Sequence, residues 1–369
     1  MGAALRNIRS QNTLKDSYKN YFTFLDSTDK PTMQKALKSL ESIGYIQNFS
    51  ELYSQHYQTL QHNMLFALNP SFQNDIMANL KSDPILLAYN PSDAFIDLGL
   101  SDRDKKYIWY LSPNFKKIRA NDFDGQSVGL NFTLGGNIDD TSLLTFSTNV
   151  SDSSFSFENA NFKNQYFNLS SNYVLDLQSF KILSSASIGI IKNDLERQIL
   201  LSSQTLNANY NSILNSLQLG LAKDFDFNNI TLTPLIYFNY NFIRQNAFDE
   251  SDGLFAKSYE AINHHSTSLA GGLNFAYLLE QENLKTKLSS FFIYEYRLSG
   301  KNIHSKVSFK DFPDQKFMQY YNLHSKMITW GISSSFNYPN SFFVRFNLIN
   351  EFTKNQYNIN FSTDLGFRF

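Results

Sequence analysis

The adjacent histidines His264 and His265 come closest to a catalytic pattern in this sequence. Four carboxylates lie nearby, within the long segment that precedes the histidines, at Asp249, Glu250, Asp252 and Glu260. A histidine beside a carboxylate could act as the general base of a hydrolase. However, the chain contains no Gly-x-Ser-x-Gly, His-Glu-x-x-His or glycine-rich phosphate loop. We therefore expect this segment to be a solvated loop end, and we predict no catalytic residue, no cofactor and no metal site.

The composition of the 369-residue chain narrows the class of protein further. Its 32 Lys and Arg residues balance 33 Asp and Glu residues, so the chain lacks the basic surface of a nucleic-acid binder. The absence of cysteine excludes disulfides, thiolate metal sites and a cysteine nucleophile. Aromatic residues make up 16% of the chain, yet no apolar run reaches the ~18 residues of a membrane-spanning helix. Two architectures remain open: a large soluble all-β protein and an outer-membrane β-barrel, which hides its lipid face in alternation.

The first hundred residues show helical periodicity. Asp29 before Pro31 suits the start of a helix. Apolar residues then recur at helical spacing, namely Met33, Ala36, Leu37 and Leu40. We expect this helix to end near Gly44.

Two further helices are predicted downstream. The first covers 49–68, with an apolar stripe opposite a face of Gln, His and Asn. A shorter helix is predicted over 71–81, and residues 82–104, with Pro84, Pro91 and several aspartates, are predicted to form a linker.

From about Lys106 onward the apolar period changes to two. In the last segment one face carries Tyr357, Ile359, Phe361, Leu365, Phe367 and Phe369, whereas the other carries Asn358, Asn360, Ser362, Asp364 and Arg368. Such alternation indicates strands with one apolar and one polar face. Several segments run longer than the average of about 5–6 residues for globular strands and match the ~9–11 residues of membrane-spanning strands. Strand length therefore favours the barrel over a soluble sandwich.

Twelve such segments can be counted. They lie near 106–118, 124–135, 141–150, 161–175, 178–191, 207–223, 229–242, 265–279, 284–298, 325–337, 341–353 and 356–369. The segment near 207–223 changes phase around Ile213. The fold class predicted from this count is an all-β membrane protein: a twelve-stranded antiparallel transmembrane β-barrel, preceded by an α-helical segment that plugs the pore. The corresponding domains are 1–104, for the helices and linker, and 105–369, for the barrel.

The connections between these segments alternate in length. Those after even-numbered strands are short: 136–140, 176–177, 224–228, 279–283 and 338–340. The longest follow strands seven and nine, at roughly 243–264 and 299–324. Outer-membrane barrels have short periplasmic turns and longer external loops. This parity predicts that the C-terminus, at Phe369, lies in the periplasm.

A twelve-stranded barrel would enclose a lumen wide enough for one helix. Charged residues on the polar faces of the predicted strands are candidates for its wall, namely Lys181, Lys285, Lys287, Glu295, Arg297, Arg345 and Glu351. Two interpretations remain open: these residues contact a threaded helix or a passing chain, or they line a solvated pore. The segment 49–68 is long enough to be the threaded helix, with 71–81 or part of 92–105 as alternatives.

Two stretches of the chain carry a family resemblance. The first comprises Thr231-Leu232-Thr233-Pro234-Leu235-Ile236-Tyr237, then Asn246-Ala247-Phe248-Asp249-Glu250, then Ser266-Thr267-Ser268-Leu269-Ala270-Gly271-Gly272-Leu273. The second is the terminal Leu365-Gly366-Phe367-Arg368-Phe369. They resemble the strand, loop and aromatic end of the translocator (β-domain) of monomeric, type Va autotransporters of Gram-negative bacteria. Leu235 stands where the family often has tyrosine and Ala247 where it often has glycine.

The resemblance covers about residues 105–369 and implies both a function and partners. It implies an outer-membrane barrel that anchors an N-terminal passenger and helps to export it to the cell surface, through type V secretion. It also implies that Leu365, Gly366, Phe367 and Phe369 form a signal for the barrel assembly machinery. The expected partners are outer-membrane lipid, that machinery and the chain's own passenger, but not nucleic acid, and the expected state is a monomer. No signature of the self-cleaving subgroup is present.

Alternatives of other classes also remain. A diffusion channel or porin would need no N-terminal helix, and an outer-membrane hydrolase would depend on His264 and His265. Neither a signal peptide nor a passenger is visible. We therefore expect the chain to be a truncated or processed fragment of a longer precursor, with Met1 as an artificial start.

Overall fold

The computed structural model describes residues 1–11, 13–41, 45, 48, 107–139, 141–177, 179–202, 204–281, 284–338 and 341–369. The predicted helices over 49–68 and 71–81, the linker over 82–104 and the predicted helix end at Gly44 lie outside these residues.

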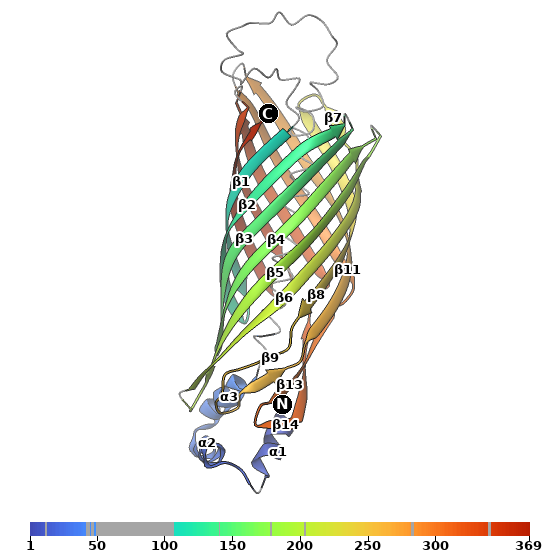
Figure 1. The fold of residues 1–369 in the computed structure, drawn as a ribbon. Helices are drawn as coiled ribbons and strands as arrows, with labels where there is room; N and C mark the ends of the chain where they lie inside the picture. Colours follow the sequence, from blue (N-terminus) through green and yellow to red (C-terminus); the bar gives the residue numbers. More distant parts are fainter. Residues whose placement is uncertain are drawn as a thin grey trace, which may run out of the picture.

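Twelve antiparallel strands close into a barrel (Figure 1). Around the barrel the order is β11-β12-β15-β16-β17-β1-β2-β3-β4-β5-β6-β8, and β8 pairs with β11 to complete the ring. The strands are β1 (Tyr107–Ala120), β2 (Phe123–Asp139), β3 (Ser142–Phe157), β4 (Ala160–Asp176), β5 (Lys181–Ile199), β6 (Gln204–Ala222), β8 (Ile230–Gln245), β11 (Ile262–Gln281), β12 (Leu284–Ser299), β15 (Lys326–Asn337), β16 (Phe342–Phe352) and β17 (Gln356–Arg368). A short β7 (Phe225–Phe227) pairs with β8 in the turn after β6. The predicted twelve-stranded barrel is confirmed.

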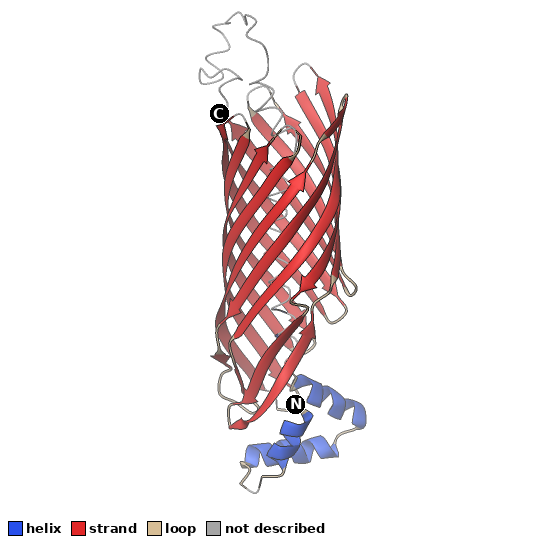
Figure 2. Cartoon of the chain, turned by 90° about the vertical axis from the view of Figure 1, so that its right-hand side faces the viewer, coloured by secondary structure: helices blue, strands red, loops and turns tan. Residues whose placement is uncertain are grey.

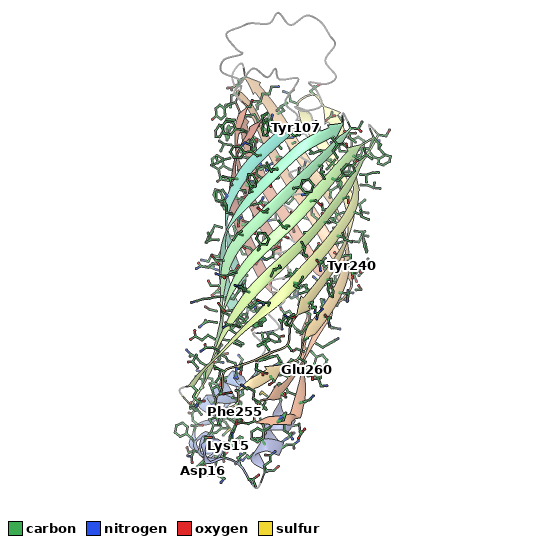
Figure 3. The ribbon with its side chains drawn as sticks, in the orientation of Figure 1. Lys15, Asp16, Tyr107, Tyr240, Phe255 and Glu260 are labelled. Carbon is green, nitrogen blue, oxygen red and sulfur yellow. The ribbon has the colours of Figure 1, made fainter. Side chains whose placement is uncertain are left out.

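Several strands are longer than the sequence predicts. β5 and β6 each have 19 residues and β11 has 20, and the predicted turn over 136–140 belongs largely to β2. The added residues of β2 lie at the end of the barrel that contains Tyr107, where Gly136 pairs with Tyr107. The added residues of β5 and β6 lie at the opposite end, which we call the mouth (Figures 1 and 3). The other end, where Tyr107 and the C-terminus lie, is called the base.

An apolar belt surrounds the middle of the barrel on its outer face. One row of paired residues marks its limit on the mouth side: Leu130, Val150, Phe167, Ile190 and Ile213, on β2 to β6, all of them exposed. The next outward-facing row toward the mouth is polar on β3 to β6, with Asp152, Gln165, Lys192 and Asn211. Exposed apolar area on this scale is stable in hydrocarbon but not in water. The two rows therefore place one lipid–water boundary across the barrel.

Beyond this boundary the polarity of the two faces is reversed. In β6 the outward residues change from Leu217 and Ile213 to Asn211 and Asn207, while the inward residues change from Ser216 to Leu214, Tyr210 and Leu206. The pairing of β6 with β5 continues without a register shift through Ile213. The phase change in the sequence therefore marks the membrane boundary rather than a bulge.

A second sheet continues the wall beyond the mouth. Its order is β14-β13-β10-β9, formed by β9 (Phe248–Asp249), β10 (Lys257–Tyr259), β13 (Asn302–Phe309) and β14 (Phe312–Asn322). The amide of Ser251, just after β9, donates to the carbonyl of Asn207 on β6 at 2.7 Å. We call this sheet, with the ends of β4, β5 and β6 beyond the boundary, the outer extension. The predicted loop over 299–324 is thus mostly strand, and half of the predicted loop over 243–264 is strand, which is a correction.

Three helices pack at the mouth, on the outer extension (Figure 2). They are α1 (Gly2–Arg9), α2 (Asp16–Ser27) and α3 (Lys30–Ser39). In α3 the Asp29 carboxylate accepts from the amide of Thr32 at 3.4 Å and Pro31 lies in the first turn, so the predicted helix start is confirmed. Its end at Ser39 comes earlier than predicted. The sequence analysis assigned neither α1 nor α2, although Tyr18, Tyr21, Phe22 and Leu25 follow helical spacing.

The helices and the outer extension share one hydrophobic core. Leu5, Ile8, Tyr18, Phe22 and Leu25 from the helices are buried with residues from the strands. Strand residues of this core include Ile191, Leu195, Leu214, Phe255, Val307 and Phe309. This packing explains the reversal of polarity, because in this part of the barrel the interior is filled by a core as in a soluble protein.

The base is closed by the pairing of the first and last strands. Tyr107 and Phe369 exchange backbone hydrogen bonds of 2.8 and 3.0 Å, and the rings of Trp109 and Phe367 lie 5.5 Å apart. Leu365, Phe367 and Phe369 are exposed on the outer face, whereas Gly366 is buried against the opposite one. The terminal strand thus presents its alternate apolar side chains to lipid.

Replacing Gly366 with alanine is expected to weaken this seam. An added Cβ would meet the Trp109 carbonyl oxygen and the Phe343 ring, and backbone cannot give way cheaply. Overpacking of this kind costs about 1–3 kcal/mol, measurable by denaturant unfolding of the barrel in micelles. The control is Gly271→Ala, because a Cβ there lies 3.9 Å from its nearest neighbour, the Leu235 carbonyl oxygen. Equal stability of the two variants would contradict this reading of the seam.

Candidate functional sites in the lumen and at the mouth

The charged residues predicted for the lumen lie on the inward-facing side of the strands. Lys181, Lys287, Glu295, Arg345 and Glu351 are buried there, Arg297 is partly buried, and Lys285 is exposed near the base end of β12. Strand register brings some of them into rows. Lys287 pairs with Ser335, Ser335 with Arg345, and Arg345 with Asp364. Glu351, farther toward the mouth, accepts from Asn358 at 3.0 Å.

Two ion pairs in the lumen wall involve acids that the sequence analysis did not select. Arg345 donates through Nε to Asp364 at 2.6 Å, and Asn347 donates to the same carboxylate at 2.9 Å. Lys181 lies 2.5 Å from Asp224 in the turn after β6. Asp364 occupies a polar position of the alternating pattern, and the strand register places it opposite Arg345, whereas Asp224 lies in a turn outside that pattern. The wall near the base is therefore ordered by charge-assisted contacts.

The two histidines do not form a site. His264 lies within β11 and is buried on its inner face, so the expected solvated loop end is wrong for this residue. His265 lies on the outer face, where its Nδ1 is 2.7 Å from the Tyr240 hydroxyl and its ring stacks on Phe242 at 4.6 Å. The nearby carboxylates pair with cations instead: Glu250 with Arg197, Asp252 with Lys310, and Glu260 with Lys306 and Lys316. These four ion pairs therefore engage the three carboxylates with arginine and lysine rather than with either histidine.

The outer extension contains a buried charged cluster that sequence reasoning missed. Arg197 of β5 donates two hydrogen bonds to Glu250, from Nε to Oε1 at 2.7 Å and from Nη2 to Oε2 at 2.5 Å. Glu250 also accepts from the amide of Lys257 at 2.9 Å and from the Tyr259 hydroxyl at 3.0 Å. Arg197, Glu250 and Lys257 are all at most 2% exposed. We call these three residues the charged cluster.

The charged cluster contacts the C-terminal end of α3. Arg197 Nη1 donates to the Ser39 carbonyl at 3.1 Å, and Lys257 Nζ donates to the Leu40 carbonyl. The Ser39 hydroxyl accepts from the amide of Leu200 at 3.2 Å. The last carbonyls of a helix lack intrahelical partners and carry partial negative charge. Hydrogen-bond donors from two basic side chains of the barrel therefore satisfy the end of α3.

The chain beyond α3 enters the barrel. Tyr45 is buried among the rings of Tyr210, Phe248 and Tyr259, with centroid distances of 6.0, 5.4 and 4.7 Å, and its hydroxyl bonds to Gln245. Asn48 accepts from Asn164 on β4 at 2.8 Å. Both residues contact inward-facing side chains of the outer extension, so Tyr45 and Asn48 lie inside the mouth.

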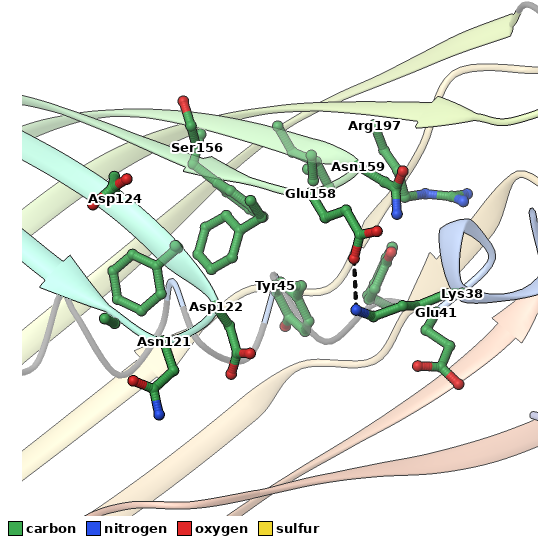
Figure 4. Close-up of a pocket in the computed structure, with 17 residues that line it drawn as sticks. Lys38, Glu41, Tyr45, Asn121, Asp122, Asp124, Ser156, Glu158, Asn159 and Arg197 are labelled. Atoms are coloured by element: carbon green, nitrogen blue, oxygen red, sulfur yellow. Dashed lines mark hydrogen bonds and ion pairs between the residues drawn. The ribbon is translucent and has the colours of Figure 1, made fainter. Parts of the chain in front are cut away.

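A cavity of about 450 Å³ lies between α3 and the turns after β1 and β3 (Figure 4). Lys38 crosses it to reach Glu158 at 2.6 Å. Its lining combines aromatic rings with acids, including Tyr45, Phe123, Phe157, Asp122 and Glu158. The ion pair thus ties α3 to the β3–β4 turn beside an open seam.

The packing of the helices on the mouth is expected to weaken in acid. Burial acts to raise the pKa of Glu250, but Arg197 outweighs it and holds the pKa below its usual 4.5. A carboxylate with a lowered pKa contributes stability above its unfolded pKa and loses it as pH falls through the folded one. Burial, followed by repulsion from Arg197, lowers the pKa of Lys257 well below 10.5, so the stability linked to this residue falls as pH drops from 10.5 toward its folded pKa.

Hydrogen exchange of α1–α3 measured from about pH 6 to about pH 3, corrected for intrinsic rates, tests this expectation. The wild-type chain should lose protection below the usual carboxyl pKa, whereas Glu250→Gln should show a flatter profile. Identical profiles for the two proteins would contradict the assignment.

Among the residues that the structure describes, no helix is long and apolar enough to span a membrane. Within the same residues, no group of three or more metal-ligating side chains comes together.

Comparisons with known proteins agree with this architecture. The family model described as the autotransporter beta-domain matches residues 116–360. The translocator domain of the autotransporter NalP from Neisseria meningitidis is 16% identical, with a TM-score of 0.58 over 72% of this chain and 88% of that one. The beta domain of the Bordetella autotransporter BrkA is 11% identical, with a TM-score of 0.51 over 72% of this chain and 99% of that one. At these identities the two structures establish the fold alone. No curated protein matches the chain by sequence.

The family match spans most of the barrel, including β8, the loop that carries Glu250, and β11. It bears out the resemblance drawn from the sequence, and the family is one of transport domains rather than enzymes. The chain belongs to the autotransporter beta-domain family and is an outer-membrane β-barrel translocator domain, whose family implies a passenger of its own.

Proposed function

We propose that the barrel sits in the outer membrane with its mouth outside the cell and its C-terminus in the periplasm, and that the chain between Asn48 and Tyr107 passes through the lumen. One observation carries this proposal: Asn48 lies inside the mouth, whereas Tyr107 begins β1 at the base. The outer extension, with its polar outer face, supports this orientation. It projects farther from the lipid than the short turns at the base do, and outer-membrane barrels have their longer connections outside the cell.

We propose the two domains that the sequence predicts. Residues 1–104 comprise the passenger end, the helical linker and the pore segment, and residues 105–369 form the barrel. The helix predicted over 49–68 is our candidate for the pore segment. Lumen residues that could contact it or a passing chain are Lys285, Glu295, Arg297, Arg345 and Glu351.

Three further partners and states are proposed. Leu365, Gly366, Phe367 and Phe369 would be read by the barrel assembly machinery, and the apolar belt would contact outer-membrane lipid. Because β8 pairs with β11 and closes the barrel, no sheet edge is left there for a second copy to pair with. The barrel is therefore proposed to act as a monomer.

Deleting residues 1–104 separates the translocator from a diffusion channel. A barrel with a chain through its lumen should conduct poorly in planar bilayers, and the deletion should open it. A porin should conduct steadily with or without these residues. Low conductance after deletion, in a barrel shown to be folded and inserted, would refute the plugged lumen.

A further inference from the structure

The helices α1–α3 are too short for their intrinsic stability to explain why they are folded. The helices have 8, 12 and 10 residues. Isolated helices shorter than about 12–15 residues are marginal in water. The buried rings of α2 pack on the outer extension: those of Tyr18, Tyr21 and Phe22 all lie against Phe255. The surface that stabilises these helices thus belongs to the outer extension.

Phe255 is held in a backbone conformation that is unfavourable for its type. Its φ is +56°, in the left-handed region that bulky residues rarely adopt. In this conformation the ring is fully buried at the centre of the docked helices, with centroids 4.9 Å from Tyr18 and 5.0 Å from Tyr21. The Tyr18 hydroxyl also accepts from the Phe255 amide at 3.3 Å. A strained backbone conformation persists only where the packing around it holds it in place. Around Phe255 this packing includes α2.

The charged cluster also recognises one position in the chain, the C-terminal end of α3. Two basic side chains, Arg197 from β5 and Lys257 from β10, donate to the carbonyls of Ser39 and Leu40, where α3 ends. Ala36 and Ser39 are completely buried against this wall. A buried ion pair contributes little net stability but strongly disfavours arrangements that leave its charges uncompensated. If α3 slid by one residue, the two basic side chains would face different carbonyls and Ser39 would lose its contact with Leu200.

We propose that the outer extension is a docking surface whose occupant is the segment 1–41 of this chain, that α1–α3 fold only on it, and that Arg197 and Lys257 act as a register stop by recognising the end of α3. The stop fixes which residues enter the mouth, beginning with Tyr45. This proposal rests on contacts within the chain, so it stands apart from the orientation and plug proposed above.

The test uses the full chain in detergent and two readouts. The first is hydrogen exchange, resolved for α1–α3 and for the barrel strands. The second is crosslinking of the pair Lys38→Cys and Glu158→Cys by a short thiol reagent, since these side chains meet at 2.6 Å at the exposed seam and the chain has no other cysteine. The pair Lys30→Cys and Glu158→Cys is the off-register control, because eight residues of helix span about 12 Å.

Two variants probe the stop and the surface separately. Arg197→Met removes the cation that holds the Ser39 carbonyl. Phe255→Gly removes the ring and relaxes the left-handed backbone, so any loss of docking must come from the ring. Glu196→Gln is the matched control, because Glu196 adjoins Arg197 but is exposed on the outer face.

Both variants should keep barrel protection while α1–α3 exchange at least ~100-fold faster. The 38–158 crosslink should fall in both, and the 30–158 crosslink should rise in Arg197→Met as register is lost. Wild-type protection of α1–α3 in both variants would overturn the proposal. If Arg197→Met fails to fold, Phe255→Gly decides alone. Failure of the orientation or conductance tests would leave these results unchanged, so the two proposals fail independently.

Discussion

Replacing Leu217 with arginine is expected to lower the free energy of unfolding by about 2–4 kcal/mol, because a charge on the lipid face near the bilayer midplane has no aqueous partner. Leu217 is 55% exposed on the outer face of β6, where the outward residues from Ile213 to Leu221 are apolar except for Asn215. Reversible denaturant unfolding in lipid vesicles measures the effect.

The control lies on the same face of the same strand. Asn211 is outward-facing and exposed beyond the mouth-side limit of the belt, so Asn211→Arg should change stability by no more than about 0.5 kcal/mol. The difference between the two variants measures the boundary itself. Equal costs at both positions would mean that the polarity reversal in β6 does not mark the edge of the lipid.

Asp364→Asn is expected to be the most damaging single change in the lumen wall, at about 3–5 kcal/mol. Its carboxylate is fully buried and compensates the charge of Arg345, whose side chain is only 5% exposed. Removing the carboxylate leaves a buried cation without its counter-charge, which costs far more than the intact pair contributes. The measurement is again the free energy of unfolding in micelles or vesicles.

A second variant separates the charge from the packing. Arg345→Met combined with Asp364→Leu removes both charges and should recover most of the loss, because apolar replacement of a buried pair is often neutral. A single variant no less stable than the double one would contradict the assigned role of the pair. Because Asp364 adjoins the terminal assembly segment, the yield of folded barrel should be recorded alongside stability.

The sequence predicted the barrel well because its signal is local. Alternation over a dozen residues reports which face of a strand meets lipid, and the twelve strands were placed to within a few residues except at the mouth. There the rule itself changes, since β5 and β6 leave the membrane and bury apolar side chains inward. The outward apolar face of β5 ends at Ile190, so this strand was predicted eight residues too short at the mouth. In β6 the predicted strand continued past the phase change at Ile213 to residue 207, close to its observed start at Gln204.

The outer extension was missed for a related reason. β13 has a clear alternation, with Ile303, Val307 and Phe309 buried, but it lies in what strand parity marks as an external loop. Loops of this length were treated as irregular. Likewise the spacing of Tyr18, Tyr21, Phe22 and Leu25 predicts a helical face, yet only the structure shows what covers it.

The charged cluster could not be predicted from local patterns. Arg197 and Glu250 are 53 residues apart in the chain, and Ser39 is a further 158 residues from Arg197. Each residue by itself is compatible with a polar loop or a strand end. Only the closure of the barrel brings β5, the β9–β10 turn and the end of α3 together. Glu250 lies within a stretch that carried the family resemblance, which was the one available signal, but its partner was not identifiable.

Cysteine labelling in intact cells tests the central claim most directly, since the chain contains no cysteine of its own. Three single variants sample β6 and the turn after it: Asn209→Cys in the outer extension, Leu217→Cys in the belt, and Asp226→Cys at the base. With a membrane-impermeant maleimide, a barrel in the proposed orientation should label at 209 in intact cells, at 226 only after the outer membrane is permeabilised, and at 217 in neither case. Labelling of 217 in intact cells, or of 226 without permeabilisation, would contradict a lipid-embedded barrel whose mouth faces outward.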